Sequence, residues 1–161
     1  MGRIVDRIEE LGLALPPVPA PAGSYLPALR SGSYVYTSGQ IPMRDGAPLA
    51  VGKVGSQVTQ QTATELAATC VLNGLAAVSS VADLDSIVRV VKVVGFVASD
   101  PEFTAQPAVL NGASDLLAQI FGPAGQHVRS AVGVAVLPLN VPVEVELVVE
   151  VRAEPDEHST S

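Results

Sequence analysis

The chain has 161 residues, 48% of them hydrophobic, which is enough to bury the core of one domain. Its formal net charge is -7 and its nine Lys and Arg residues are scattered, which argues against a nucleic-acid partner. One cysteine excludes an internal disulfide, and no segment reaches the about 20 apolar residues that span a bilayer, so we expect a soluble, cytoplasmic protein without a membrane partner.

Four segments follow one another along the chain. Residues 1–14 have apolar side chains at helical spacing and predict a short amphipathic helix that ends at Gly12. Residues 15–24 are rich in proline and predict an extended tether over the surface. Residues 25–153 form the predicted domain, and the polar residues 154–161 predict a disordered tail.

Hydrophobic periodicity predicts two long helices and three strands in this domain. The helices cover residues 58–81 and 107–121, where apolar side chains recur on one face. Residues 86–98 are almost continuously β-branched and predict a strand that is covered on both faces. Residues 128–137 and 141–152 predict two further strands, and the second alternates Val or Leu with Glu.

A hairpin is predicted ahead of the first long helix. Residues 33–40 form a β-branched and aromatic run, and residues 43–48 contain the turn dipeptide Asp45-Gly46. The resulting fold class is α+β, with a mixed sheet and two helices packed on one face. Because the chain has no third layer for the other face, we expect that face to pack against copies of itself in a closed oligomer.

Several kinds of catalytic site find no support in the residues. A Gly-x-Ser-x-Gly elbow is absent, and with only His127 and His158 a Ser-His-Asp triad has few possible members. His127 has no His or Cys partner at ligand spacing, so no metal site is predicted. Cys70 lies on the apolar side of the first long helix, where a free cysteine is usually a small buried hydrophobe.

Arg129 is the strongest candidate for a binding residue. Strand alternation places it on the same face as small residues, which leave space around its guanidinium. It could therefore hold a substrate carboxylate in a bidentate pair. Spacing alone favours a structural ion pair with Glu144 or Glu146 over this role.

A set of short motifs spread along residues 20–152 resembles the RidA/YjgF family, also called L-PSP endoribonuclease-like. The matching residues are Tyr25, Thr37-Ser38-Gly39-Gln40, Asn111, Arg129-Ser130, Leu137-Pro138 and Glu144-Val145-Glu146. The resemblance implies a chorismate mutase-like fold and a homotrimer with sites between subunits. It also implies hydrolytic deamination of reactive 2-enamine and 2-imino acids to 2-oxo acids and ammonia, with no cofactor.

The resemblance assigns roles to individual residues. Arg129 would hold the substrate carboxylate, and Glu144 would position or activate the attacking water. The cleft would be lined by Tyr25, Ser38, Gly39 and Asn111, and the backbone carbonyl of Ala131 would help to hold the water. Taken singly, Tyr25, Ser38 and Asn111 are also ordinary structural residues of a tether, a turn and a helix surface.

Three departures from the family pattern indicate a divergent branch. The N-terminal helix and tether are long, the connection 103–111 is expanded, and Ala131 stands where many members have Cys. A non-catalytic trimeric module that binds small carboxylates or a protein partner is therefore the alternative function. Ribonuclease activity, from the family's older name, fits the acidic charge poorly.

Overall fold

A computed structural model describes residues 2–18, 20 and 23–153 of the chain. Its helices are α1 (Arg3–Glu10), α2 (Gln60–Ser79) and α3 (Gln106–Phe121). Its strands are β1 (Ala28–Ser31), β2 (Tyr34–Thr37), β3 (Met43–Arg44), β4 (Ala47–Pro48), β5 (Ile87–Ala98), β6 (Val128–Val134) and β7 (Val143–Val151). Short 3-10 turns occur at η1 (Leu84–Ser86), η2 (Gly122–Gly125) and η3 (Pro138–Asn140).

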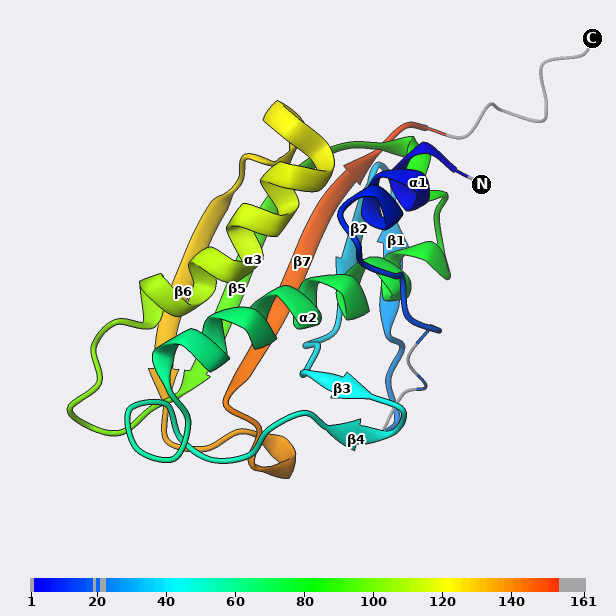
Figure 1. Cartoon of the computed structure of the whole chain (residues 1–161). Coiled ribbons are helices and arrows are strands. Elements are labelled where there is room, and N and C mark those ends of the chain that lie inside the picture. The colour runs from blue at the N-terminus through cyan, green and yellow to red at the C-terminus, as the bar shows by residue number, and fades with distance from the viewer. Residues whose placement is uncertain (1, 19, 21–22, 154–161) are drawn as a thin grey trace, which may run out of the picture.

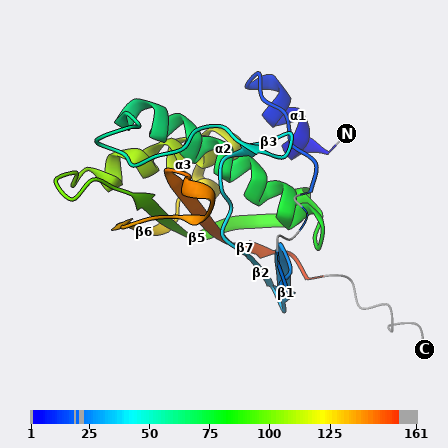
Figure 2. The ribbon, with the colours of Figure 1, turned by 90° about the horizontal axis from the view of Figure 1, so that it is seen from below.

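The strands form a five-stranded mixed sheet with the order β1-β2-β7-β5-β6 (Figure 1). Only β5 and β6 are parallel, and the other neighbouring pairs are antiparallel. Helices α2 and α3 lie side by side over one face of this sheet (Figure 2). The predicted α+β class with two helices on a mixed sheet is confirmed, and α1 adds a third helix that packs beside α3 and η1.

The core lies between the helices and the sheet, and β7 shows how the sequence builds it. Every second side chain of β7 is buried under the helices, as the predicted alternation requires. The intervening side chains, including Glu144 and Glu146, lie on the opposite face and are half-buried. Cys70 of α2 is fully buried, which confirms its predicted role as a small core residue and raises the pKa of its thiol.

The face of the sheet that points away from the helices corrects one prediction. We predicted that residues 86–98 form a strand covered on both faces. The strand is β5, but Val88 is 45% exposed, and on the adjoining β6 Val128 is 66% exposed. Within the described residues the chain therefore covers only one face of β5, because all three helices lie on that face of the sheet.

The N-terminal half differs from the prediction in one strand. The Asp45-Gly46 turn, with φ of 52° and 78°, joins β3 to β4 in a separate two-stranded sheet. The predicted turn is therefore confirmed, whereas the predicted place of residues 33–40 in this hairpin is wrong. Strand β1 was not predicted, and β2 pairs with β1 and β7. Strand β1 is only four residues long, and its sequence Ala-Leu-Arg-Ser does not alternate apolar with polar residues.

The predicted tether and tail have different outcomes. Residues 15–18 are described and have no regular secondary structure, whereas the predicted tail 154–161 lies outside the described residues.

In the part of the chain that is described, no helix combines the length and the apolar character needed to cross a bilayer.

The two long helices meet closely at Gly112. A Cβ added to this glycine would overlap the backbone carbonyl oxygen of Thr64 in α2. Backbone atoms cannot move out of the way as a side chain can, so only glycine fits at this contact.

We predict that Gly112→Ala destabilises the protein by about 1–3 kcal/mol, because overpacking will push α3 away from α2. This loss should exceed the gain of up to about 1 kcal/mol that alanine offers in a helix interior. Urea unfolding of the variant will measure the change. Gln119→Ala, at an exposed position of the same helix, is the matched control and should stay near the wild type; an unchanged or more stable Gly112→Ala protein would refute this close contact.

Candidate functional site

The predicted site residues fall into two groups in the structure. Arg129 and Asn111 meet at the sheet edge formed by β6, beside α3. Tyr25, Gly39 and Glu144 line a cavity on the other side of the molecule, next to the β3–β4 hairpin.

Arg129 is held by three neutral acceptors of α3. Its Nη1 donates to Asn111 Oδ1 and to Ser114 Oγ, both at 3.0 Å, and its Nη2 donates to the Pro107 carbonyl oxygen at 3.1 Å. The alternative of an ion pair with Glu144 or Glu146 is wrong for the described residues, since neither carboxylate reaches the guanidinium. No carboxylate in that part of the chain therefore neutralises the charge of Arg129.

These bonds leave a defined part of the guanidinium available. Of its five N–H groups, both on Nη1 and one on Nη2 are used. The Nε–H and the second Nη2–H, on neighbouring nitrogens, make no bond to any described residue. A pair of parallel N–H donors is the geometry that binds a carboxylate with two hydrogen bonds.

Ser114 connects Arg129 to His127. The Nδ1 atom of His127 lies 2.6 Å from the Gly125 carbonyl oxygen, which can only accept, so Nδ1 bears a proton, and in the Nδ1–H tautomer Nε2 is an acceptor. The Nε2 atom then accepts from the Ser114 hydroxyl at 2.9 Å. This leaves a lone pair of Ser114 Oγ directed at Arg129, so the imidazole fixes which way the hydroxyl points.

Sequence reasoning missed Ser114 and set His127 aside. Pro107, Asn111 and Ser114 are spaced four and three residues apart, which places them on one face of a helix. The polar side chains of Asn111 and Ser114, one turn apart on this face, were the available signal, and only Asn111 was identified.

Glu144 belongs to the second group and lies close to Gly39. A Cβ added to Gly39 would overlap the Glu144 carboxylate, so a larger residue there would make this carboxylate turn away from its present position. Partial burial raises the pKa of Glu144, and the negative charge of Glu146 raises it further. Glu144 therefore holds a proton more tightly than an ordinary glutamate, which favours a role in proton transfer.

The remaining predicted residues have distinct places. Tyr25 is 50% exposed at the mouth of the cavity. The Ser38 hydroxyl donates to the Leu26 carbonyl oxygen at 2.6 Å, which ties the end of β2 to the segment before β1. Ala131 pairs with Gly95 of β5, and its side chain packs against the core.

Arg129 and Glu144 do not meet within one chain. Arg129 is in register with Val93 and, one strand further, with Leu147, both of which face the helices. Glu144 lies three residues from Leu147 along β7, two strands away from β6 and on the opposite face of the sheet. One chain therefore presents two half-sites.

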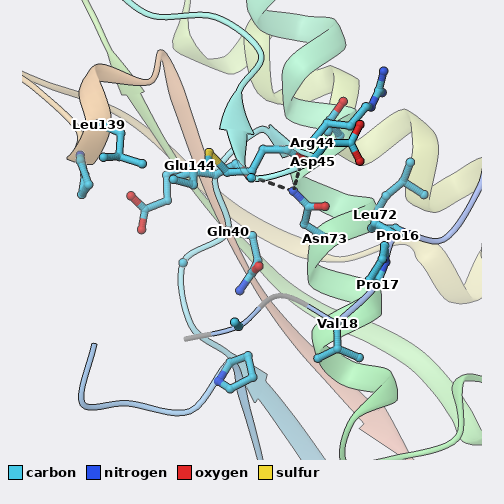
Figure 3. Close-up of a pocket in the computed structure, with 18 of the residues that line it drawn as sticks. Pro16, Pro17, Val18, Gln40, Arg44, Asp45, Leu72, Asn73, Leu139 and Glu144 are labelled. Carbon is cyan, nitrogen blue, oxygen red and sulfur yellow. Dashed lines mark hydrogen bonds between the residues drawn. The ribbon is translucent and has the colours of Figure 1, made fainter. Parts of the chain in front are cut away.

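The cavity that contains Glu144 has a volume of about 680 Å³. Figure 3 shows Glu144 and Leu139 at one side of it, Pro16, Pro17 and Leu72 at the other, and Gln40 and Asn73 between them. Gln40 and Asn73 are only 6% and 8% exposed, and sequence reasoning assigned neither to the site. Among the described residues, no group of three or more His, Cys, Asp or Glu residues could hold a metal ion.

Comparison with known proteins finds one family and several similar chains. The family model described as "YjgF/chorismate mutase-like, putative endoribonuclease" matches residues 5–151. Protein TCP17 of Trypanosoma cruzi is 40% identical over 153 residues, which cover 94% of this chain and 96% of that protein.

Two solved structures are similar over nearly their whole length. The Agrobacterium tumefaciens protein Atu1372, described as having unknown function, is 43% identical with a TM-score of 0.87, and the match covers 93% of each chain. A "putative endoribonuclease" from Shewanella oneidensis is 34% identical with a TM-score of 0.88, and the match covers 92% of this chain and 99% of that one.

We predict that Ser114→Ala weakens binding of a small carboxylate by about tenfold, because Arg129 loses an anchor worth about 1.5 kcal/mol. Pyruvate is the probe, and isothermal titration calorimetry measures its affinity. Ser33→Ala, at the opposite edge of the sheet, is the control serine and should bind like the wild type. Equal affinities of the Ser114→Ala variant and the wild type would show that Ser114 does not position Arg129.

Proposed function

The chain belongs to the YjgF/chorismate mutase-like family, and from that premise we propose that it hydrolyses reactive 2-imino and 2-enamine acids to 2-oxo acids and ammonia. The observation that carries this proposal is the uncompensated Arg129 guanidinium with two neighbouring N–H groups available. A substrate carboxylate would complete this arrangement.

The site is proposed to form between copies of the chain in a homotrimer. Because Arg129 and Glu144 lie on different half-sites of one chain, a second copy has to bring its Arg129 to Glu144. Asn111 and Ala131 would come with Arg129, while Tyr25, Ser38 and Gly39 would come with Glu144. The uncovered apolar face of the sheet, with Val128 and Val132 exposed, supports association of this kind.

The reaction proposed for this site needs water and proton transfer. Arg129 holds the carboxylate and so fixes the imine carbon in place. A water oxygen bonds to that carbon while Glu144 takes one of its protons. That proton passes to the nitrogen as the C=N bond becomes a single bond, which gives an amino alcohol. The hydroxyl proton then passes to the nitrogen, the C–N bond breaks, and ammonia leaves as the C=O bond forms. The imine itself is the electrophile, so the proposal includes no cofactor.

Two other functions make different use of the same residues. A non-catalytic trimeric module would bind 2-oxo acids through Arg129 without turnover. RNA cleavage, which the family description includes, is disfavoured by the net charge of -7 and by the scattered basic residues.

The direct test follows the hydrolysis of 2-iminobutyrate, generated in place by an amino-acid oxidase. We expect the wild type to accelerate ammonia release, and Arg129→Ala to lose at least about 100-fold in kcat/KM, since a desolvated charged pair contributes about 3 kcal/mol. Arg129→Lys should recover little, because one ammonium cannot replace the planar fork.

Arg30→Ala is the control for general loss of positive charge, since Arg30 lies on β1 at the far edge of the sheet. Absence of acceleration by the wild type, or equal acceleration by Arg129→Ala, would refute the proposal. Binding of 2-oxo acids without turnover would support the non-catalytic module instead, and cleavage of a defined RNA would support the ribonuclease.

The pH dependence provides an independent prediction. If the Glu144 carboxylate accepts the proton, kcat/KM rises with pH as Glu144 ionises, and its raised pKa moves this rise to higher pH. Glu146→Gln removes the like charge and lowers the pKa of Glu144, so the rise should move to lower pH. The full pH profile of each protein measures this shift.

Glu150→Gln is the matched control, because Glu150 lies on the same face of β7 but further from Glu144. Its profile should coincide with that of the wild type. If Glu146→Gln does not shift the pH profile of kcat/KM, or if Glu144→Gln leaves that profile unchanged, Glu144 does not take part in the proton transfer.

A further inference from the structure

We propose that the cavity beside Glu144 binds the substrate's side chain, so that the preferred substrates are 2-imino acids with a large aromatic side chain. This inference rests on the proposed function and adds the class of substrate. The cavity volume of about 680 Å³ is the first argument. Ligand pockets typically measure about 300–1,000 Å³, and a three- or four-carbon imino acid would leave most of this one empty.

The lining of the cavity matches an apolar side chain. Segments distant in sequence contribute it: the tether, the β3–β4 hairpin, α2 and η3. Among its apolar members are Pro16, Pro17, Val18, Ile41, Leu72 and Leu139. Flat proline rings and branched aliphatic chains bury an aromatic ring without offering it a competing polar contact.

Arg44, Asp45 and Thr69 also line the cavity, and two buried residues, Gln40 and Asn73, add amide groups to it. The Nδ2 of Asn73 donates to the Ile41 and Met43 carbonyl oxygens at 2.9 and 3.4 Å, which fixes its orientation and directs Oδ1 away from them. The Nε2 of Gln40 donates to the Ser38 carbonyl oxygen at 3.1 Å, which fixes Oε1 in the same way.

Neither amide oxygen accepts a hydrogen bond from any described residue, and no fully buried side-chain oxygen in that part of the chain lacks a partner. Both oxygens are therefore accessible from the cavity, where a ligand that donates to one of them gains a hydrogen bond. An aromatic ring with a hydroxyl group satisfies both the apolar walls and one of these oxygens.

The cavity is continuous with the proposed reaction centre, because Gly39 and Glu144 line it together with the tether residues. A substrate whose imine carbon lies near Glu144 can therefore extend its side chain between Gln40 and Asn73 toward Leu72 and Val18 (Figure 3). Pro16, Pro17, Val18 and Ala20 then form one wall of the substrate pocket.

Binding of stable 2-oxo acids tests this pocket without requiring turnover. Calorimetric titration with pyruvate, phenylpyruvate and 4-hydroxyphenylpyruvate should give affinities that increase in that order. We expect phenylpyruvate to bind at least about tenfold more tightly than pyruvate, because its ring leaves water for the apolar cavity. The hydroxyl should add a further severalfold through Gln40 or Asn73.

Three variants locate the effect. Leu72→Phe and Val18→Trp fill the cavity and should each abolish most of the preference for phenylpyruvate over pyruvate. Gln40→Met removes an acceptor and should reduce the added affinity of the hydroxyl. Leu29→Phe and Val51→Trp, both at exposed positions, are the matched controls and should keep the wild-type preference.

Thermal unfolding will show whether Leu72→Phe folds. If it does not, Val18→Trp still tests the pocket, because Val18 is exposed and its replacement does not disturb the core. Equal binding of pyruvate and phenylpyruvate by the wild type, or a preference that Val18→Trp leaves intact, overturns the inference even if imines are hydrolysed. A preference for the aromatic acids that Val18→Trp abolishes, in a protein that hydrolyses no imine, supports the pocket and refutes the proposed function alone.

Discussion

Strand alternation in the central sheet is the constraint on which the site depends. Helices α2 and α3 need an apolar face beneath them, and every second residue of β7 supplies it. Glu144 is thereby placed on the opposite face, whereas Arg129, in register with the buried Val93, turns toward α3. The same packing that stabilises the fold separates the two residues. Association of chains is thus part of the proposed chemistry, because no side-chain rotation within one chain can bring them together.

The sequence predicted the fold wherever an element was long enough to show a period. Helices α2 and α3 and strands β5 and β7 agree with the predicted ranges to within a few residues. Strand β1 was not predictable in this way, because four residues at a sheet edge show no alternation. The position of the proline-rich tether could not be predicted from the sequence either. An extended segment has no hydrophobic period, and only its tertiary contacts determine where it lies.

The candidate site was predictable in its residues but only partly in its geometry. The resemblance identified Arg129, Asn111, Gly39 and Glu144 and implied a site between subunits, yet it did not indicate which of these residues share a half-site. Spacing left an ion pair for Arg129 open, and the structure replaces it with neutral acceptors from α3. That difference matters chemically, because a guanidinium already paired with a carboxylate would have little affinity for a substrate anion.

The environment of Glu144 links stability to the proposed reaction. Burying a carboxylate beside Glu146 disfavours its charged form, so this arrangement costs folding free energy at neutral pH. The cost is fully present above the raised pKa and disappears once Glu144 is protonated at low pH, where the folded protein binds the proton more readily than the unfolded chain. A base gains strength from the same environment, since the proton it accepts is held more tightly. Because Gly39 leaves no room for a side chain between itself and Glu144, the backbone there admits the carboxylate and fixes its approach to the cavity. The feature that weakens the fold is therefore the one that suits Glu144 to take a proton from water.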